Sequence, residues 1–221
     1  PHPPTAATPR PAHPAPPLPE SHAASGLSYR AAEQFDKAEA EFEKAIELNP
    51  RLFEPIHFYA QMARSQGKFE KAAELFCRAA DVRPEDYQAI AIAANVYQAL
   101  GDSVNEKRCT KESVERAKRA LDLNPNDARA WILGAGSLGR LGRKDEAFEW
   151  AERSLSIAPE SPGTAYNYAC LLAGFGEIER AINQVENAIR LGSRNKLYFE
   201  TDCDFDPLRD HPRFKRLLDS I

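Results

Sequence analysis

The chain has 221 residues, of which 43% are hydrophobic and 28% charged, and its formal net charge is −4 at pH 7. This acidic balance argues against a nucleic-acid partner, because such proteins meet phosphates with clustered basic residues. No uninterrupted apolar run approaches the length of about 18 residues that a membrane-spanning helix requires, so no membrane partner is expected.

Residues 1–19 contain nine of the 17 prolines. Such a composition cannot bury enough apolar surface to offset the entropy of ordering, so we expect a flexible linker over residues 1–20 that tethers a preceding domain. The segment Pro16–Pro19 also fits the loose P-x-x-P pattern that aromatic grooves bind, although no Arg or Lys flanks it.

After the linker, a series of glycines and a series of prolines recur with the same spacing in the sequence. Helix-closing glycines stand at Gly67, Gly101, Gly142 and Gly176, with spacings of 34, 41 and 34 residues. Prolines at Pro50, Pro84, Pro125 and Pro159 repeat the same spacings. The pattern predicts a repeat array over 21–195, with helix-turn-helix units near 19–52, 53–86, 87–127, 128–161 and 162–195.

The third unit is longer than its neighbours. The seven extra residues lie between Gly101 and Pro125, and they correspond to two helical turns, which return the apolar face to nearly the same direction. We therefore expect the second helix of this unit to be about 10 Å longer than its counterparts.

These units resemble the tetratricopeptide repeat (TPR), in which a large apolar residue, a small residue and an aromatic precede A-x-x-x-F-x-x-A and a closing proline. The resemblance is carried in the first unit by Gly26, Tyr29, Phe35, Ala38, Phe42, Ala45 and Pro50, and in the fourth by Trp131, Ala135, Leu138, Gly142, Ala147 and Pro159. It implies an all-α fold, a right-handed TPR superhelix of about five repeats whose first helices line a concave groove.

The stretch Gly134–Gly139 reads G-x-G-x-x-G, which is also the fingerprint of dinucleotide-binding proteins. That function needs a strand before the first glycine, whereas the repeat register puts this stretch inside a helix. Helical glycines cost about 1 kcal/mol each relative to alanine, so they require another reason. Two reasons remain open: close packing of a neighbouring helix, or backbone access for a partner.

The last segment, 196–221, is expected to form a turn and a capping helix. Phe214, Leu217, Leu218 and Ile221 follow helical spacing and suit the exposed end of a repeat array. Asp202, Asp204 and Asp206 have the spacing that opens an EF-hand calcium loop. The loop's later glycine and glutamate are replaced by Pro207 and Arg213, so turn and cap roles are expected, and no metal.

No arrangement of nucleophile, base or phosphate-binding residues is recognisable, so we expect neither an enzyme nor a cofactor. The cysteines are far apart and form no C-x-x-C pair, which favours free thiols in a reducing cytoplasm; they are Cys77, Cys109, Cys170 and Cys203.

The ending ETDCDFDPLRDHPRF, after repeats with one lengthened unit, is similar to the C-terminal TPR region of bacterial multidomain signalling proteins such as cyclases, kinases and winged-helix activators. The resemblance implies a non-catalytic protein–protein interaction scaffold, the regulatory or partner-binding module of a larger protein. Self-association into a homodimer is the alternative.

A peptide or protein segment would bind in the concave groove. The inward stripe of the first helices supplies the candidate contacts, although the same stripe could be merely solvated: Glu54, His57, Gln61, Arg64, Gln88, Asn95, Gln98, Arg129, Gly136, Gly139, Arg140 and Tyr166. Because Arg64, Arg129 and Arg140 are cationic in an acidic protein, we expect a ligand with some negative charge.

Overall fold

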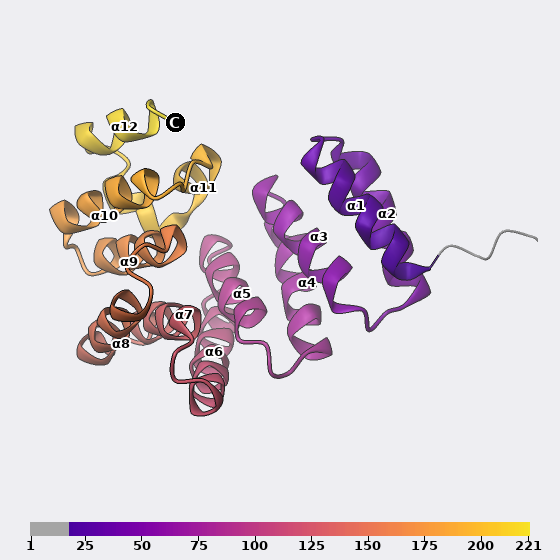
Figure 1. Ribbon diagram of the computed structural model, residues 1–221, viewed down its shortest axis with the longest axis horizontal. Coiled ribbons are helices and arrows are strands. Elements are labelled where there is room, and N and C mark those ends of the chain that lie inside the picture. The colour runs from indigo at the N-terminus through magenta and orange to yellow at the C-terminus, as the bar shows by residue number, and fades with distance from the viewer. Residues whose placement is uncertain (1–17) are drawn as a thin grey trace, which may run out of the picture. The chain divides into compact units, whose positions relative to one another are not determined.

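The computed structural model describes residues 18–221, and every regular element among them is helical (Figure 1). The chain divides into two compact units, one ending at Pro50 and the other comprising Arg51–Ile221. Consecutive helices within each unit pack as antiparallel pairs joined by short turns, which confirms the expected all-α TPR fold. Residues 1–17, the main part of the expected linker, lie outside the described residues.

The first unit is one helix pair, α1 (Pro19–Ala31) and α2 (Phe35–Leu48). Helix α1 begins with Pro19, so residues 19 and 20 of the expected linker are helical; proline is well suited to this position because the first backbone N–H groups of a helix have no helical partner. Gly26 is required for the close approach of the two helices. A Cβ there would lie 2.6 Å from Cε1 of Phe42, which is fully buried.

The second unit holds four further pairs and a C-terminal segment. The pairs are α3 (Phe53–Ser65) with α4 (Phe69–Val82), α5 (Gln88–Ala99) with α6 (Ser103–Leu123), α7 (Ala128–Arg140) with α8 (Lys144–Ile157), and α9 (Pro162–Gly174) with α10 (Ile178–Arg190). The segment comprises α11 (Lys196–Thr201), the 3-10 helix η1 (Cys203–Leu208) and α12 (Pro212–Leu218).

The turn inside each pair is one repeated structure. At Gly67 the backbone φ is +72°, and Gly101, Gly142 and Gly176 have nearly the same value. The N–H of Gly67 donates to the carbonyl of Arg64 and that of Lys68 to the carbonyl of Ala63, which is the hydrogen-bond pattern of a Schellman cap. The first pair makes the same cap with Glu33, at φ 57°, where glycine would carry no steric cost.

The lengthened third unit appears as the long helix α6. This helix has 21 residues, whereas α4 and α8 have 14 each, so the sequence expectation is confirmed. Its middle combines a polar contact with apolar packing: the fully buried hydroxyls of Ser113 and Ser137 are 2.9 Å apart, and the next residue, Val114, belongs to the hydrophobic core.

The G-x-G-x-x-G stretch lies in the continuous helix α7, with no strand before it. A Cβ at Gly134 would lie 2.4 Å from the Trp150 ring, and one at Gly139 would lie 2.6 Å from Cδ1 of Leu171. These two glycines therefore serve helix packing. Gly136 differs, because the nearest neighbour of its Cβ would be Nη1 of Arg140 at 3.8 Å.

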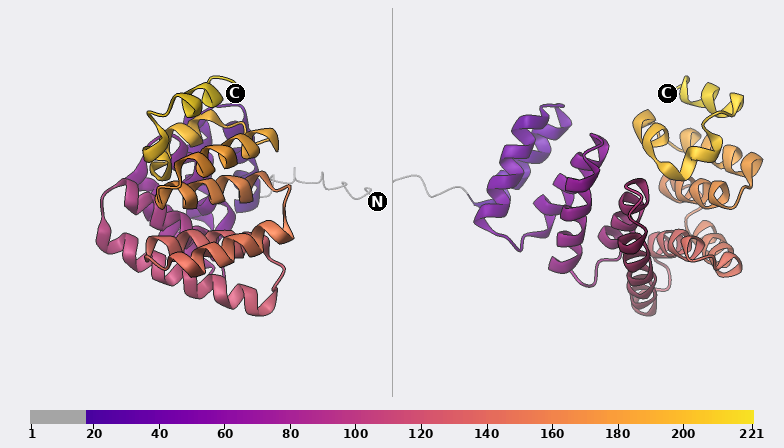
Figure 2. Two further views of the ribbon diagram at one scale, coloured as in Figure 1. Left: turned by 90° about the vertical axis from the view of Figure 1, so that its left-hand side faces the viewer. Right: turned by 180° about the vertical axis from the view of Figure 1, so that it is seen from behind.

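The C-terminal segment closes the second unit by burying aromatic side chains. Phe199, Phe205, Leu208 and Phe214 are at most 1% exposed and join the core cluster formed by α7, α9 and α10. Both views of Figure 2 show this yellow segment against orange α9 and α10, in agreement with the packing of η1 on α9 and of α12 on α10. Among the described residues, no helix combines the length and apolar character needed to cross a bilayer.

Candidate functional site

A pocket of about 330 Å³ lies where the first helices of four pairs converge. Helices α3, α5, α7 and α9 supply most of its wall, and Glu106 of α6 and the turn at the start of η1 supply the rest. Its lining mixes apolar and polar side chains: Arg64, Ala91, Ile92, Asn95, Gln98, Glu106, Ile132, Leu133, Gly136, Gly139, Arg140, Tyr166, Asn167, Cys170, Leu171, Gly174, Phe175, Asp202 and Asp204.

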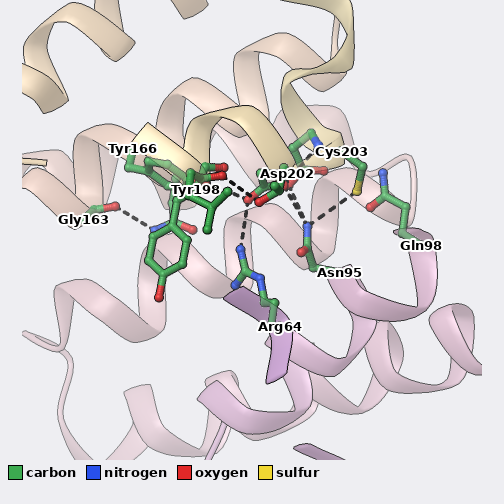
Figure 3. A network of polar contacts seen from close by, with 12 residues as sticks. Arg64, Asn95, Gln98, Gly163, Tyr166, Tyr198, Asp202 and Cys203 are labelled. Atoms are coloured by element: carbon green, nitrogen blue, oxygen red, sulfur yellow. Dashed lines mark hydrogen bonds and ion pairs between the residues drawn. The ribbon is translucent and has the colours of Figure 1, made fainter. Parts of the chain in front are cut away.

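Asp202 is the centre of a polar network that ties four elements together (Figure 3). Its carboxylate accepts hydrogen bonds from the Tyr166 hydroxyl at 2.8 Å, from Nδ2 of Asn95 at 3.2 Å and from Nη2 of Arg64 at 3.3 Å. Only 6% of Asp202 is exposed, so the charge is compensated by one guanidinium group and two neutral donors.

Asp204 forms a second ion pair in the pocket wall, with Arg140. Nη2 of Arg140 donates to its Oδ2 at 2.7 Å, and Nε of the same guanidinium donates to Oε1 of Gln98 at 2.8 Å. Asn95 also reaches Asp204, at 3.4 Å, and so joins the two acidic residues. The pocket wall thus contains two adjacent ion pairs, Arg64–Asp202 and Arg140–Asp204.

Burial governs the protonation of these groups. It raises the pKa of the Asp204 carboxyl, and the guanidinium of Arg140 opposes that shift. Burial also works against the charge of Arg140, but the carboxylates of Asp204 and Asp202 outweigh it and raise the pKa of Arg140. Burial and the charge of Asp202 raise the pKa of Tyr166, which therefore remains a hydrogen-bond donor.

The local sequence explains why the carboxylates point this way. Asp202 precedes η1 and its Oδ1 accepts the backbone N–H of Asp204 at 3.1 Å, a helix N-cap. Phe199 and Phe205, on either side, are fully buried and their rings lie 5.7 Å apart. Burying such side chains stabilises the segment by several kcal/mol, so the two phenylalanines anchor the acidic turn that forms this wall of the pocket.

Cys170 lies beside the two carboxylates. Its Sγ and the oxygens of Asp202 and Asp204 are within 4.8 Å of one another, a spacing that would fit a metal ion. Burial raises the pKa of the Cys170 thiol well above its usual range, and the adjacent carboxylates add to this. A cation there would also compete with Arg64 and Arg140 for the carboxylates, so the donor set is poorly suited to metal binding.

The structure brings part of the predicted stripe together. Residues that line the pocket are Arg64, Asn95, Gln98, Gly136, Gly139, Arg140 and Tyr166. The remaining predicted residues are elsewhere and contact one another or their neighbours. Glu54 pairs with Arg83 at 2.9 Å, Gln61 contacts His57 at 2.8 Å, and Arg129 donates to Gln88 at 2.5 Å.

Sequence reasoning missed the acidic side of the site. The sequence predicts turn and cap roles for Asp202 and Asp204, and Asp202 does cap η1, but their contacts with Arg64 and Arg140 span more than 60 positions. One general signal was present: buried cations need counter-charges, and the D-x-D segment supplies carboxylates, although it lies 138 positions after Arg64 in the sequence. The apolar wall from Ile92, Leu133 and Phe175 was also missed.

Comparison with known families agrees with the geometry. Residues 19–52 match the tetratricopeptide repeat family (TPR_2), and residues 110–162 match a second tetratricopeptide repeat family (TPR_16). The chain therefore contains tetratricopeptide repeats.

Two curated proteins illustrate its relatives. Protein O-mannosyl-transferase TMTC1 of Mus musculus is 24% identical over 152 residues, which are 69% of this chain and 15% of that protein. Protein FlbA of Caulobacter vibrioides is 31% identical over 149 residues, 67% of this chain and 24% of that protein. The chain thus spans a small fraction of the relatives that it matches.

Solved structures share the fold. TTC0263, a thermophilic TPR protein of Thermus thermophilus, superimposes with a TM-score of 0.60 at 20% identity, over 85% of this chain and 99% of that one. Pseudomonas aeruginosa pilF gives a TM-score of 0.53 at 17% identity, over 90% and 88% of the two chains. YrrB, described as a TPR protein with an unusual peptide-binding site, gives 0.50 at 19% identity, over 81% and 89%.

Proposed function

We propose that residues 51–221 form a non-catalytic protein-interaction scaffold whose pocket between α5, α7 and α9 binds an extended peptide segment of a partner protein. The observation that supports this most directly is Gly136. This glycine lies on the pocket wall, and its missing side chain leaves open space rather than room for a neighbouring helix.

The lining indicates the kind of segment that would bind. Ile92, Leu133 and Phe175 offer an apolar surface, and the pocket volume is in the range of sites that enclose a single large side chain or small ligand. Gln98 and Asn95 stand at the polar side. An apolar side chain flanked by backbone amide groups is the ligand that this combination favours.

The sequence led us to expect a ligand with some negative charge, and we now modify that expectation. Arg64 and Arg140 are paired with Asp202 and Asp204 of the same chain, so the wall is close to neutral. The negative charge expected of a partner at these two arginines is supplied by the protein itself. Arg129 lies apart from this wall, against Gln88.

The wider role proposed here is that of a partner-binding, regulatory module in a larger signalling protein. TPR proteins generally mediate protein–protein interactions, and the solved relative YrrB is described as having a peptide-binding site. Four free cysteines favour a reducing, cytoplasmic setting. The alternative, self-association, is tested by light scattering of the chain at several concentrations: a constant monomer mass excludes it.

The pocket hypothesis is tested with peptides selected from a displayed random library against the unmodified chain. Gly136→Leu places a side chain in the open space, and the peptides should lose at least about tenfold in affinity, equivalent to about 1.4 kcal/mol. Gly163→Leu is the matched control, since Gly163 is also helical, has room for a Cβ and does not line the pocket. Peptides that bind both variants as well as the unmodified chain would exclude the pocket as the binding site.

A further inference from the structure

The start of α6 inverts a pattern that the second helices of the other pairs share. Counted from the residue with positive φ that closes the first helix of each pair, the third residue is acidic and exposed in four pairs, and the fifth is a fully buried alanine. These residues are Asp36, Glu70, Asp145 and Glu179 at the third position and Ala38, Ala72, Ala147 and Ala181 at the fifth. In α6 the third residue is Val104, which is 78% exposed, and the fifth is Glu106, which is half-buried and lines the pocket. An apolar side chain thus faces solvent, and an acidic one faces the pocket.

Helix pairing in the third unit does not need Glu106. In the first, second and fourth units the buried alanine stands twelve residues before the closing proline, and Ser113 has that place before Pro125. Ser113 is fully buried, and its hydroxyl is 2.9 Å from that of Ser137 on α7. Because the two added turns of α6 move this contact to Ser113, the side chain of Glu106 is left to the pocket.

The carboxylate of Glu106 has no protein partner. Its backbone is fixed within the helix, since its N–H donates to the carbonyl of Asp102 at 2.9 Å and its own carbonyl accepts the Thr110 hydroxyl at 2.7 Å. Within residues 18–221, however, no hydrogen bond or ion pair reaches the carboxylate. Partial burial of a carboxylate without a counter-charge is unfavourable, so a cationic ligand would gain by supplying one.

Glu106 is also the uncompensated charge of the pocket lining. The other charged side chains of the lining form the ion pairs Arg64–Asp202 and Arg140–Asp204. Each of those arginines is paired within the chain, whereas the third acidic side chain is not. The pocket described by residues 18–221 therefore presents one negative charge to whatever enters it.

We propose that the pocket binds a partner segment through a lysine or arginine side chain whose cation pairs with the carboxylate of Glu106. The proposal rests on the peptide-binding function stated above and specifies the chemistry of its ligand. Lysine and arginine combine a long apolar stem with a cationic end, so the stem would lie along Ile92 and Leu133 while the end reaches Glu106. The ligand charge is then positive, opposite to the charge that the arginines of the stripe suggested.

Selection from two displayed random peptide libraries tests the proposal on the full chain. One library contains all amino acids, and in the other glutamine replaces lysine and arginine. The first should yield peptides that contain a basic residue and lose affinity for the Gly136→Leu variant. The second should yield no peptide that is sensitive to Gly136→Leu.

A double-mutant cycle on a selected peptide then locates the contact. Glu106→Gln should weaken binding about tenfold, because a hydrogen bond between charged groups is lost. Replacing the basic residue of the peptide by norleucine should have the same effect, and the two changes together should weaken binding no further than either alone. Glu115→Gln is the matched control: it makes the same charge change on the exposed face of α6, outside the pocket, and should alter affinity by less than about twofold.

The outcomes separate this proposal from the one on which it rests. Peptides that respond to Gly136→Leu but bind Glu106→Gln as tightly as the unmodified chain would leave the pocket in place and overturn the cationic ligand. If no selected peptide responds to Gly136→Leu, the pocket is not the binding site and both proposals are wrong. Glu106→Ala installs the residue of the other four pairs and should not lower the melting temperature. A fall of several degrees would assign Glu106 a structural role and contradict its assignment to a ligand.

Discussion

Nη2 of Arg140 and Oδ2 of Asp204 are 2.7 Å apart although 64 positions separate the two residues in the sequence. The pair joins the end of α7 to the start of η1, and both side chains are less than 20% exposed, at 17% and 18%. Asp204 of the C-terminal segment thus forms an ion pair with Arg140, a cation that the repeat pattern would make available to a partner protein.

Arg140→Ala should therefore lower the stability of the folded chain. Removing the cation leaves Asp204 in a mostly buried position without its strongest donor, and we expect the free energy of unfolding to fall by about 2–4 kcal/mol. Urea denaturation measures this. Arg129→Ala is the control, because its bond to Gln88 is exposed and should contribute less than about 0.5 kcal/mol. Equal losses in the two variants would mean that the Arg140 pair is no stronger than a surface contact.

Alanine substitutions in α7 separate the roles of its glycines. Gly134→Ala drives a methyl group against the Trp150 ring and should destabilise the chain by about 1–3 kcal/mol. Gly136→Ala meets no close atom, so the gain in helix propensity should stabilise it by up to about 1 kcal/mol. Thermal melting of both variants is the measurement, and a loss of stability at Gly136 would show a packing role there.

Ala72 lies at a close helix–helix contact in α4 and is fully buried. Ala72→Leu should overpack the contact and lower the free energy of unfolding by about 1–3 kcal/mol. Glu74→Leu, on the exposed side of the same helix, should change it by less than about 0.5 kcal/mol. Unchanged stability of Ala72→Leu in urea denaturation would place the tight contact elsewhere.

Glu33 adopts the left-handed conformation that glycine takes in the other caps. Glu33→Gly should stabilise the α1–α2 pair by about 1 kcal/mol, because the Cβ clash disappears. Glu33→Ala removes the same carboxylate but keeps the Cβ, so it should bring no such gain. If both variants melt alike, the effect belongs to the charge and not to the backbone.

The fold was predictable because its signals are local and recur. Gly67, Gly101, Gly142 and Gly176 each close the first helix of a pair at the same register, and the cap that each forms involves only residues within one turn. The two extra turns of α6 were also predictable, since they preserve the direction of the apolar face.

The site was only partly predictable. The stripe that brings Arg64, Asn95 and Arg140 together follows from helical periodicity, but the partner of this stripe comes from a segment outside the repeat. Nothing in the local pattern around Asp202 specifies that its carboxylate meets Arg64, 138 positions earlier.

Repeat arrays usually fold from local contacts, so that any pair of helices can nucleate and growth spreads to its neighbours. The Asp202 network imposes a different order on residues 51–221. Arg64 is translated 138 residues before Asp202, and Asn95 107 residues before it, so both must wait until the segment around Asp202 has left the ribosome. The wall of the pocket is therefore completed only after Asp202 and Asp204 have been synthesised, and a nascent chain that stops short of them carries helices without a complete wall.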